Sequence, residues 1–447
     1  MKRIGIVVAA AAALAVPATR VVAADAAKDP IKVGILHSLS GTMAQSETPI
    51  KDVVLMGIEE VNAAGGVLGR KIEPIVEDPA SNWDLFAEKA KKLLVEDKVA
   101  TVFGCWTSVS RKSVLPVFEK YNGLLFYPVQ YEGEECSKNV IYTGATINQQ
   151  ASPGVDYLMS PQGGNKKRFY LIGSDYVYPR TTNKILRAYL TKKKGVKETG
   201  IAEEYTPFGH QDYQTIVGKI KSFCAGGDAA VINTINGDSN TPFFKELSNQ
   251  GVTAATCPVM SYSFAEVELQ ALDTKPLVGH LAAWNYYMSV KTPQNLKWMA
   301  AYKAYAAKKG IKSAITDDPM MHGYLQVKLW AAAVNKAGST DVDKVLKALE
   351  GLEIDSPVGP YKVDLENHHT AKPVYIGKIL ADGQFEIVWK TAGPVRPEPW
   401  SEVTYPGRMC DWSKDGQGTY DTVDGKRKYL TGKENAKAEE KKPEEKK

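Results

Sequence analysis

The sequence predicts an α/β protein made of two doubly wound lobes, each built on a mostly parallel sheet. Short apolar runs alternate with longer segments whose apolar residues recur at helical spacing. This alternation restarts after about residue 150, and about 420 residues remain after the N-terminal segment, more than one hydrophobic core usually serves. Strands that alternate with helices of this length form parallel sheets covered on both faces. Two such runs therefore indicate two lobes.

The first run occupies residues 31 to about 150. Residues 31–39 form a strand by their apolar content, and Thr48-Pro49 then supplies a cap residue and a first-turn proline for a helix that Gly65-Gly66 ends. The segments that follow are predicted in turn as strand 71–77, helix 84–97, strand 99–105, helix 109–121 and strand 123–129.

The second run repeats this pattern. Its predicted segments are strand 168–174, helix 180–193, strand 201–207, helix 212–224, strand 229–235, helix 241–250 and strand 258–261. A strand at 279–286 and helices at 294–309, 319–337 and 342–349 come next. Residues 354–390 change to short β segments separated by turn residues such as Asp382-Gly383.

The two ends of the chain differ from the middle. Lys2 and Arg3 precede an apolar run at 4–16, which is the layout of a secretory signal peptide cleaved after Ala24 or Ala26. The run is shorter than the roughly 20 residues of a membrane-spanning helix, so we favour a signal peptide at 1–24 over a retained anchor and expect no membrane insertion. Residues 407–447 end in Lys, Glu and Ala and are predicted to be a largely disordered charged extension.

Composition excludes several classes of function. The formal net charge of +5 is small for 447 residues and the basic residues are scattered, which argues against a nucleic-acid partner. The five cysteines allow a bridge, with Cys105 and Cys136 as the first pair to test, although each could equally be a small buried side chain. Without Cys-x-x-Cys or His-x-His, the sequence supports no metal site, and no cofactor is predicted.

Ligands of open parallel sheets bind beyond the carboxyl ends of the strands. The loops expected there are rich in hydroxyls, amides and aromatic rings, and their central stretches contain no Arg or Lys: 105–108, 127–132, 173–176, 236–240 and 261–263. Helix-start N–H groups and hydroxyls can hold a carbonyl oxygen, and flat rings can enclose a planar guest. A small neutral ligand fits this chemistry. Individually, Ser108, Asp238 and Ser239 could instead be helix caps, and Trp106, Tyr176 and Trp284 could be packing residues.

Six stretches of these loops and their surroundings carry a resemblance. They are Gly104-Cys-Trp-Thr-Ser108 with Arg111-Lys112, Tyr127-Pro-Val-Gln-Tyr-Glu-Gly133, Gly173-Ser-Asp-Tyr-Val-Tyr-Pro-Arg180, Asn236-Gly-Asp-Ser-Asn240, Gly279-His-Leu-Ala-Ala-Trp-Asn-Tyr286 and Asn367-His-His369. In them the sequence resembles the urea-binding proteins of bacterial urea ABC transporters. These are type I periplasmic binding proteins, related to amide and branched-chain amino acid binders. The resemblance covers residues 31 to about 400.

The resemblance implies a periplasmic binding protein that is not an enzyme, captures urea in an interlobe cleft and delivers it to a membrane permease. It implies lobes joined by three chain crossings, which we place near residues 149, 279 and 355. Lobe one is then 31–149 plus 279–355, and lobe two is 150–278 plus 356–400. The charged extension and Cys410 depart from the family pattern.

The resemblance also implies a set of ligand-binding residues: Trp106, Thr107, Ser108, Tyr127, Val129, Gln130, Tyr176, Asn236, Asp238, Ser261 and Trp284. The first three form one wall, and the next three supply a second loop, largely through backbone groups. Tyr176 closes from the other lobe, the following three accept from amide N–H groups, and Trp284 lies near a hinge.

Three alternatives stay open at this point. The ligand could be a short-chain amide such as acetamide or formamide. Urea needs hydrogen-bond acceptors on both sides, whereas acetamide needs an apolar spot for its methyl group. The protein could hand its ligand to a sensory receptor. A remote alternative is an exported amidase with Cys105 or Ser108 as nucleophile, but a nucleophile needs a nearby base and none of these loops contains a His.

Overall fold

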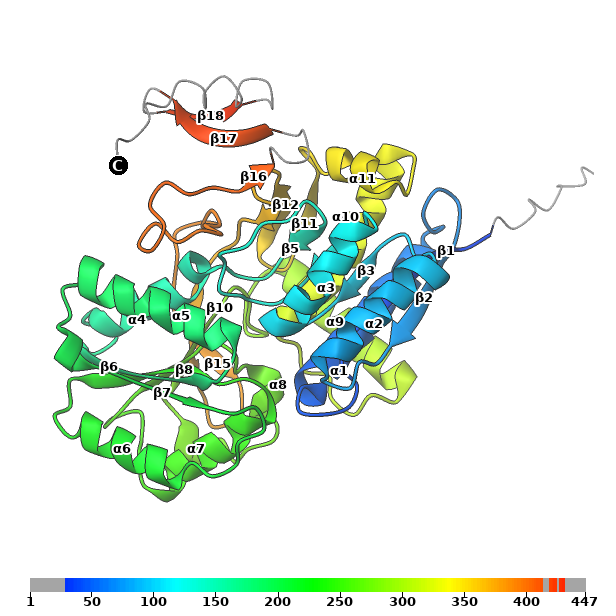
Figure 1. Ribbon diagram of the computed structural model, residues 1–447. Helices are drawn as coiled ribbons and strands as arrows, with labels where there is room; N and C mark the ends of the chain where they lie inside the picture. Colours follow the sequence, from blue (N-terminus) through cyan, green and yellow to red (C-terminus); the bar gives the residue numbers. More distant parts are fainter. Residues whose placement is uncertain (1–28, 413–417, 424–425, 431–447) are drawn as a thin grey trace, which may run out of the picture.

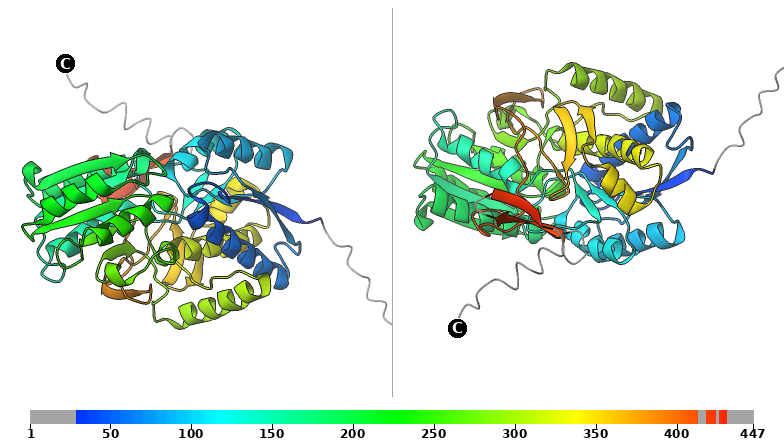
Figure 2. Two further views of the ribbon diagram at one scale, coloured as in Figure 1. Left: turned by 90° about the horizontal axis from the view of Figure 1, so that it is seen from below. Right: turned by 90° about the horizontal axis from the view of Figure 1, so that it is seen from above.

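Two lobes make up the part of the chain that the structure describes, which is residues 29–412, 418–423 and 426–430. In this computed structural model each lobe has one mixed, mostly parallel sheet with helices packed against it, which confirms the predicted fold class (Figure 1). The lobes lie side by side in two further views (Figure 2). The predicted signal peptide at 1–24 lies outside the described residues.

The first sheet has eight strands in the order β11-β12-β13-β5-β4-β3-β1-β2. Its strands are β1 (Ile31–Leu36), β2 (Ile72–Glu77), β3 (Val102–Gly104), β4 (Leu125–Tyr127), β5 (Val140–Tyr142), β11 (Glu353–Ser356), β12 (Gly359–Asp364) and β13 (His369–Thr370). Neighbours from β2 to β13 are parallel, and β11, β12 and β13 pair antiparallel at one edge. The central strands β3 and β4 are wholly buried, so they appear in the sequence as apolar runs rather than alternating patterns.

The helices of the first lobe are α1 (Ala44–Ala63), α2 (Trp83–Lys91), α3 (Ser108–Lys120), α9 (Pro293–Lys309), α10 (Asp318–Ala337) and α11 (Val342–Ala348). Helices α1 and α10 pack closely because Gly323 leaves room, since a Cβ there would lie 2.7 Å from a methyl carbon of Ile50. Helix α1 begins at Ala44, so the prediction that Thr48-Pro49 begins it is wrong. The chain already turns into the helix where Ala44 N donates to the carbonyl oxygen of Gly41.

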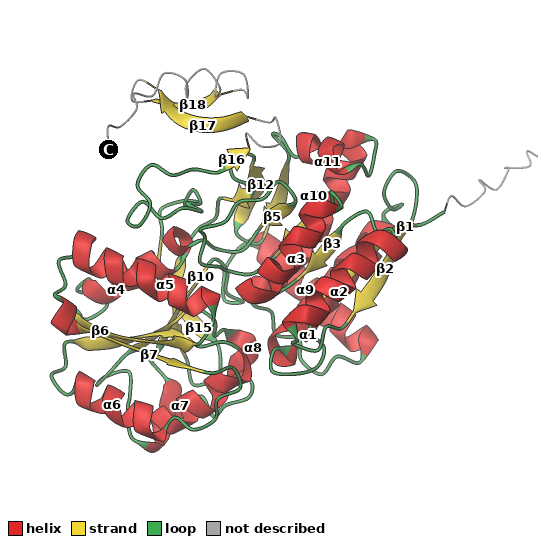
Figure 3. Ribbon diagram, viewed as in Figure 1, coloured by secondary structure: helices red, strands yellow, loops and turns green. Residues whose placement is uncertain are grey.

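The second sheet has seven strands in the order β15-β14-β10-β9-β8-β6-β7. They are β6 (Arg168–Ser174), β7 (Ile201–Thr206), β8 (Ala229–Thr234), β9 (Val259–Ser261), β10 (Leu281–Trp284), β14 (Tyr375–Ile379) and β15 (Phe385–Lys390). Its helices are α4 (Ala151–Met159), α5 (Val177–Ala188), α6 (Gln214–Cys224), α7 (Asn240–Asn249) and α8 (Glu266–Leu269). Figure 3 shows α4 and α5 on one face of this sheet and α6 and α7 on the other.

The crossings between the lobes differ in part from the expected positions. The first lies between β5 and α4. Strand β10 pairs with β9 and β14, so it belongs to the second lobe, and the second crossing follows Trp284 rather than residue 279. Strands β11 to β13 complete the first sheet through the pair His369 and Tyr142, so the third crossing follows β13 rather than residue 355. Apolar spacing identifies a strand but does not say which sheet it joins.

One side chain, Asn285, joins all three crossings. Its Nδ2 donates to the carbonyl oxygen of Gln149 at 2.9 Å and to that of Pro373 at 2.8 Å. Its backbone N donates to Asp318 Oδ2 at 3.0 Å, at the start of α10. These bonds link segments from all three crossings, and we call this point the hinge.

The cysteines pair differently from the expected pattern. Disulfides join Cys136 to Cys410 and Cys224 to Cys257, while Cys105 is free and buried. The suggested Cys105–Cys136 pair is therefore wrong, because Cys105 follows β3 inside the first lobe whereas Cys136 faces the C-terminal segment. Within the extension predicted to be largely disordered, β16 (Asp411–Trp412), β17 (Gly418–Val423) and β18 (Lys426–Leu430) form a small antiparallel sheet.

Candidate ligand-binding site

The two lobes contact each other through the loops at the carboxyl ends of their strands. Hydrogen bonds between side chains connect them: among these, Thr42 Oγ1 donates to Asp238 Oδ1, Ser46 Oγ donates to Glu268 Oε1 at 2.7 Å, and Gln130 Nε2 donates to Ser263 Oγ at 2.6 Å. The lobes are therefore closed on each other. The loops that the sequence singled out do meet at this contact.

The loop before α3 carries the first group of predicted residues. Thr107 caps the helix, and its hydroxyl accepts from Ser110 N at 3.1 Å, so its side chain is used within the helix. Ser108 is not a cap: its hydroxyl donates to Glu132 and accepts from Arg111 Nη1 at 3.2 Å. Trp106 is buried, and its Nε1 has no hydrogen-bond partner among the described residues.

Arg111 is the central residue that the sequence interpretation missed. Its guanidinium is fully buried, and Arg111 Nε donates to Glu135 Oε1 at 2.7 Å and Nη2 to Glu132 Oε1 at 3.1 Å. It also stacks over the rings of Tyr131 and Tyr127, at 4.4 and 4.9 Å from their centroids. Arg111 lies three positions after Ser108, and residues at this spacing share one face of a helix. That spacing was the available signal.

The charges around Arg111 balance. We call Arg111, Lys112, Glu132 and Glu135 the charged cluster, in which Lys112 Nζ lies 2.8 Å from Glu135 Oε2. Burial alone would lower the pKa of Arg111, but Glu135 and Glu132 outweigh it and hold that pKa well above its ordinary value. Burial would likewise raise the pKa of Glu135, yet Arg111 and Lys112 lower it to about 2. Two cations therefore face two carboxylates, leaving no uncompensated positive charge beside Ser108.

The loop after β4 supplies a second wall. The Tyr127 hydroxyl donates to the carbonyl oxygen of Trp106, which ties the two loops together. Val129 packs by its backbone on Gly144, where a Cβ would lie only 1.9 Å from the Val129 oxygen. Gln130 acts through its side chain instead: Nε2 bonds across to Ser263, and Oε1 has no partner among the described residues.

Tyr176 reaches this region from the second lobe. It precedes α5, and its ring centroid lies 4.6 Å from that of Phe208. Burial raises the pKa of its phenol well above the usual value, and the negative charges of ionised Tyr127 and of Glu132 raise this pKa further. Tyr178, which the sequence interpretation did not single out, is buried beside it. Burial also raises the pKa of Tyr178, while the polar side chains of Ser263 and Gln130 act to lower it.

The remaining predicted residues of the second lobe take different positions. Asp238 faces the first lobe through its bond with Thr42. Asn236 Nδ2 donates back to the carbonyl oxygen of Thr234, and Ser261 Oγ accepts from Asn233 Nδ2 at 3.1 Å, so both are held within their own lobe.

Trp284 lies at the end of β10, next to the hinge residue Asn285. It is buried, and its Nε1 donates to the carbonyl oxygen of Phe264 at 3.1 Å. The indole N–H is therefore already used, and Trp284 can offer a ligand only its ring.

Glu47 is a second residue that the sequence interpretation missed. Its Oε2 accepts from Ser38 N at 2.8 Å and lies 3.2 Å from His37 Nδ1, whereas its Oε1 has no partner among the described residues. Glu47 also interacts electrostatically with Cys105, which adjoins Trp106. Buried polar atoms without partners cost about 1–3 kcal/mol each, so these atoms favour a guest that completes their bonds.

Groups for catalysis or metal binding are not assembled here. The Cys105 thiol is buried, and burial raises its pKa, which disfavours the thiolate that a nucleophile needs. The neighbour of Ser108 is a carboxylate already paired with Arg111. Within the described ranges no group of three or more His, Cys, Asp or Glu side chains could hold a metal ion, and no helix is long and apolar enough to cross a membrane.

Residues 31–406 match the protein family described as "Periplasmic binding protein domain". The chain is 25% identical over 359 residues to the leucine-, isoleucine-, valine-, threonine- and alanine-binding protein of Pseudomonas aeruginosa, and this alignment covers 76% of the chain and 88% of that protein. A shorter alignment, 28% identical over 128 residues, covers 29% of the chain and 23% of the limonene hydroxylase of Geobacillus stearothermophilus.

Two solved structures show the same fold. The solute binding protein of an ABC transporter from Rhodopseudomonas palustris HaA2, in complex with p-hydroxybenzoic acid, has a TM-score of 0.71 at 20% identity and covers 83% of this chain and 99% of its own. An amino acid ABC transporter substrate-binding protein from Pseudomonas fluorescens Pf-5 has a TM-score of 0.70 at 20% identity, covering 83% and 98%.

Proposed function

Because the chain belongs to the periplasmic binding protein domain family, whose members bind solutes for ABC transporters and are not enzymes, we propose that its solute is urea, captured between the two lobes. The proposed contacts combine residues predicted from the sequence with those found in the structure. Trp106 and Tyr176 enclose the flat guest. The first backbone N–H groups of α3, at Ser108 and Val109, hold its carbonyl oxygen, because the proton of the Ser108 hydroxyl is already donated to Glu132.

The observation that carries this proposal is the balance of charge beside unpartnered acceptors. Arg111 is neutralised by two carboxylates, so a neutral ligand can bind here without leaving the charge of Arg111 unpaired. Glu47 Oε1 and Gln130 Oε1 have no partners among the described residues and can each accept from an N–H group. Urea presents two amino groups and one carbonyl oxygen, which is the complement of this set.

Short-chain amides fit less well. Acetamide would place a methyl group, and formamide a hydrogen, where urea has its second amino group. At least one buried acceptor would then stay unpaired at a cost of about 1–3 kcal/mol, or roughly five- to 150-fold in affinity.

Amino acids and aromatic acids are the competing class, because proteins similar to this chain carry such names or ligands. Their carboxylate needs an available cation or a set of free N–H donors. The Arg111 guanidinium already bonds to Glu132 and Glu135, so binding a further carboxylate there would bring a third negative charge into the buried cluster.

Capture follows from lobe closure about the hinge. A ligand that contacts both lobes favours the closed form by its difference in affinity for the closed and open forms. Urea has only four heavy atoms, and at about 1.5 kcal/mol per atom its binding free energy cannot exceed about 6 kcal/mol. Useful capture thus requires nearly every N–H group and lone pair to be satisfied. Delivery to the permease, rather than to a sensory receptor, follows the family's role.

Calorimetric titration with urea, formamide, acetamide, leucine and benzoate tests this function. We expect urea to bind most tightly, acetamide and formamide at least about fivefold more weakly, and leucine and benzoate not at all. Leucine or benzoate binding without a response to urea would refute the proposal. An assay for ammonia after incubation with urea should remain at background.

A further inference from the structure

A segment at the C-terminal end of the fold connects the lobes a fourth time. We call residues 396–410 the C-terminal strap. It follows β15 of the second sheet and passes the first crossing, where Asn148 Nδ2 donates to the carbonyl oxygen of Arg396 at 2.8 Å and Glu398 N donates to Asn148 Oδ1 at 2.9 Å. Its end, Cys410, is bonded to Cys136 of the first lobe, 274 residues earlier in the chain.

The strap lies directly on the loop that follows β4. Glu134 N donates to the carbonyl oxygen of Pro399 at 2.6 Å, and Gly133 approaches so closely that a Cβ would lie 2.4 Å from that oxygen. Lys184 of α5 in the second lobe lies 3.3 Å from Glu134 Oε1 and 3.4 Å from the Tyr405 hydroxyl. Strap, loop and second lobe therefore meet beside the lobe contact.

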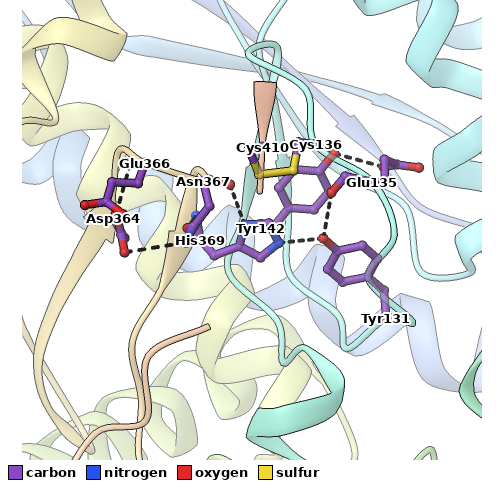
Figure 4. Close-up of a disulfide and its surroundings, with 9 residues drawn as sticks. All are labelled: Tyr131, Glu135, Cys136, Tyr142, Asp364, Glu366, Asn367, His369 and Cys410. Carbon is purple, nitrogen blue, oxygen red and sulfur yellow. Dashed lines mark hydrogen bonds between the residues drawn. A yellow bond between two sulfur atoms is a disulfide. The ribbon is translucent and has the colours of Figure 1, made fainter. Parts of the chain in front are cut away.

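The Cys136–Cys410 disulfide anchors Cys136, which directly follows Glu135 in the chain. Figure 4 shows the bridge between Cys136 and Cys410 beside Glu135 and Tyr142, with the ring of Tyr131 nearby. Glu135 Oε1 accepts from the Tyr142 hydroxyl at 2.9 Å and from Arg111 Nε at 2.7 Å. Arg111 in turn donates to the hydroxyl of Ser108. A continuous path of bonds thus runs from the strap to the ligand-facing helix start.

We propose that the Cys136–Cys410 disulfide makes the strap a positioning element of the ligand site, acting on Ser108 through Glu135 and Arg111. The inference rests on the proposed function, because Ser108 is a ligand contact there. Residues 128–139 have no helix or strand to hold them. A cross-link to a segment already anchored at Asn148 removes much of the freedom such a loop would have. Glu132 and Glu135 then meet Arg111 at fixed positions.

The second disulfide supplies a matched control. Cys224 and Cys257 lie in the second lobe, at the end of α6 and before β9, whereas the charged cluster lies in the first lobe. We compare C136S/C410S with C224S/C257S in the full chain, measuring urea affinity by calorimetry, the thermal midpoint, and amide hydrogen exchange of segments 105–112 and 128–136.

We expect C136S/C410S to bind urea roughly tenfold more weakly, as one weakened charge-assisted hydrogen bond would cause, and to exchange faster in both segments. C224S/C257S should keep its affinity within about twofold even though its thermal midpoint falls. Adding Glu135→Gln should weaken C136S/C410S less than it weakens the wild type, because both changes act through one path.

Unchanged affinity together with unchanged exchange at 105–112 in C136S/C410S would overturn the positioning role. If the wild type gives no urea signal, the proposed function fails, while the exchange of segment 105–112 still decides the role of the strap. If C136S/C410S does not fold, Glu135→Gln with the disulfide intact gives the test: it should weaken urea binding and speed exchange at 105–112, and no change in either would overturn the positioning role.

Discussion

Gln130 Nε2 donates to Ser263 Oγ at 2.6 Å across the boundary between the lobes, while the Oε1 of the same amide has no partner among the described residues. One side chain thus contributes to closure and keeps an acceptor for the guest. This double use explains why an uncharged residue can matter as much as a charged one in a site for a neutral ligand.

The first prediction concerns this residue. Gln130→Ala removes the bond across the lobes and the acceptor, so we expect urea affinity to fall by about 1–3 kcal/mol, or roughly five- to 150-fold. Calorimetry measures the loss. Gln211→Ala, at an exposed position of the second lobe, serves as the control and should change nothing. Equal affinities of wild type and Gln130→Ala would remove Gln130 from the site.

The second prediction concerns Arg111. Arg111→Ala leaves Glu132 and Glu135 buried with only the partly exposed Lys112 beside them, and breaking a buried ion pair on one side costs about 3–5 kcal/mol of unfolding free energy. Denaturant unfolding should show this loss. The control is Arg180→Ala, whose ion pair with Asp175 is exposed and should contribute at most about 1 kcal/mol. Similar losses in the two variants would contradict a tightly paired cluster.

The third prediction concerns Glu266, a buried residue of α8 at the lobe contact. Burial raises the pKa of its carboxyl to about 8, and Asp318 and Glu268 add to this, although the hydrogen bond from Met288 N opposes it. The folded protein therefore keeps a proton that the unfolded chain releases above its ordinary pKa. Stability should fall as pH rises from about 4.5 to 8, by at most about 1.4 kcal/mol per unit.

Glu266→Gln tests this pH dependence. Without the titrating carboxyl, the unfolding free energy of the variant should fall less steeply between pH 5 and pH 8. The stability of the variant relative to the wild type should therefore be greater at pH 8 than at pH 5. Glu353→Gln, at an exposed position, is the control. Parallel pH profiles of wild type and Glu266→Gln would contradict a retained proton at Glu266.

The fourth prediction concerns the hinge. Asn285→Ala removes the bonds to Gln149 and Pro373 and leaves two carbonyl oxygens without this partner, so unfolding should become about 1–3 kcal/mol easier. With the crossings no longer tied, X-ray scattering should also show a broader range of lobe separations without ligand. Asn249→Ala, at an exposed position of α7, should behave as wild type. A compact, unchanged scattering profile for Asn285→Ala would exclude the hinge role.

Sequence patterns predicted the strands and helices well where burial on both faces gives an apolar run, as in β3 and β6. They could not assign β10 to a lobe, because the apolar run of Leu281–Trp284 is the same whichever sheet it joins. Only the pairing with β9 and β14 decides that question.

The site was predicted as loops, and this is why its charges were missed. Ser108 lies where the loop ends, whereas Arg111 lies in the helix. Arg111 contacts Ser108 because residues three positions apart share one face of a helix. Glu47 was missed because the helix was predicted to begin at Thr48, whereas α1 begins at Ala44 and includes Glu47. The link between Cys136 and Cys410 spans most of the chain, and no local pattern indicates such a pairing.

A crystal structure of the full chain grown with urea tests the central claim most directly. We expect one urea molecule between the lobes, with its plane beside Trp106 and Tyr176, its oxygen at Ser108 and the start of α3, and its amino groups at Gln130 and Glu47. Density at another place, or a carboxylate bound to Arg111 in place of urea, would contradict it.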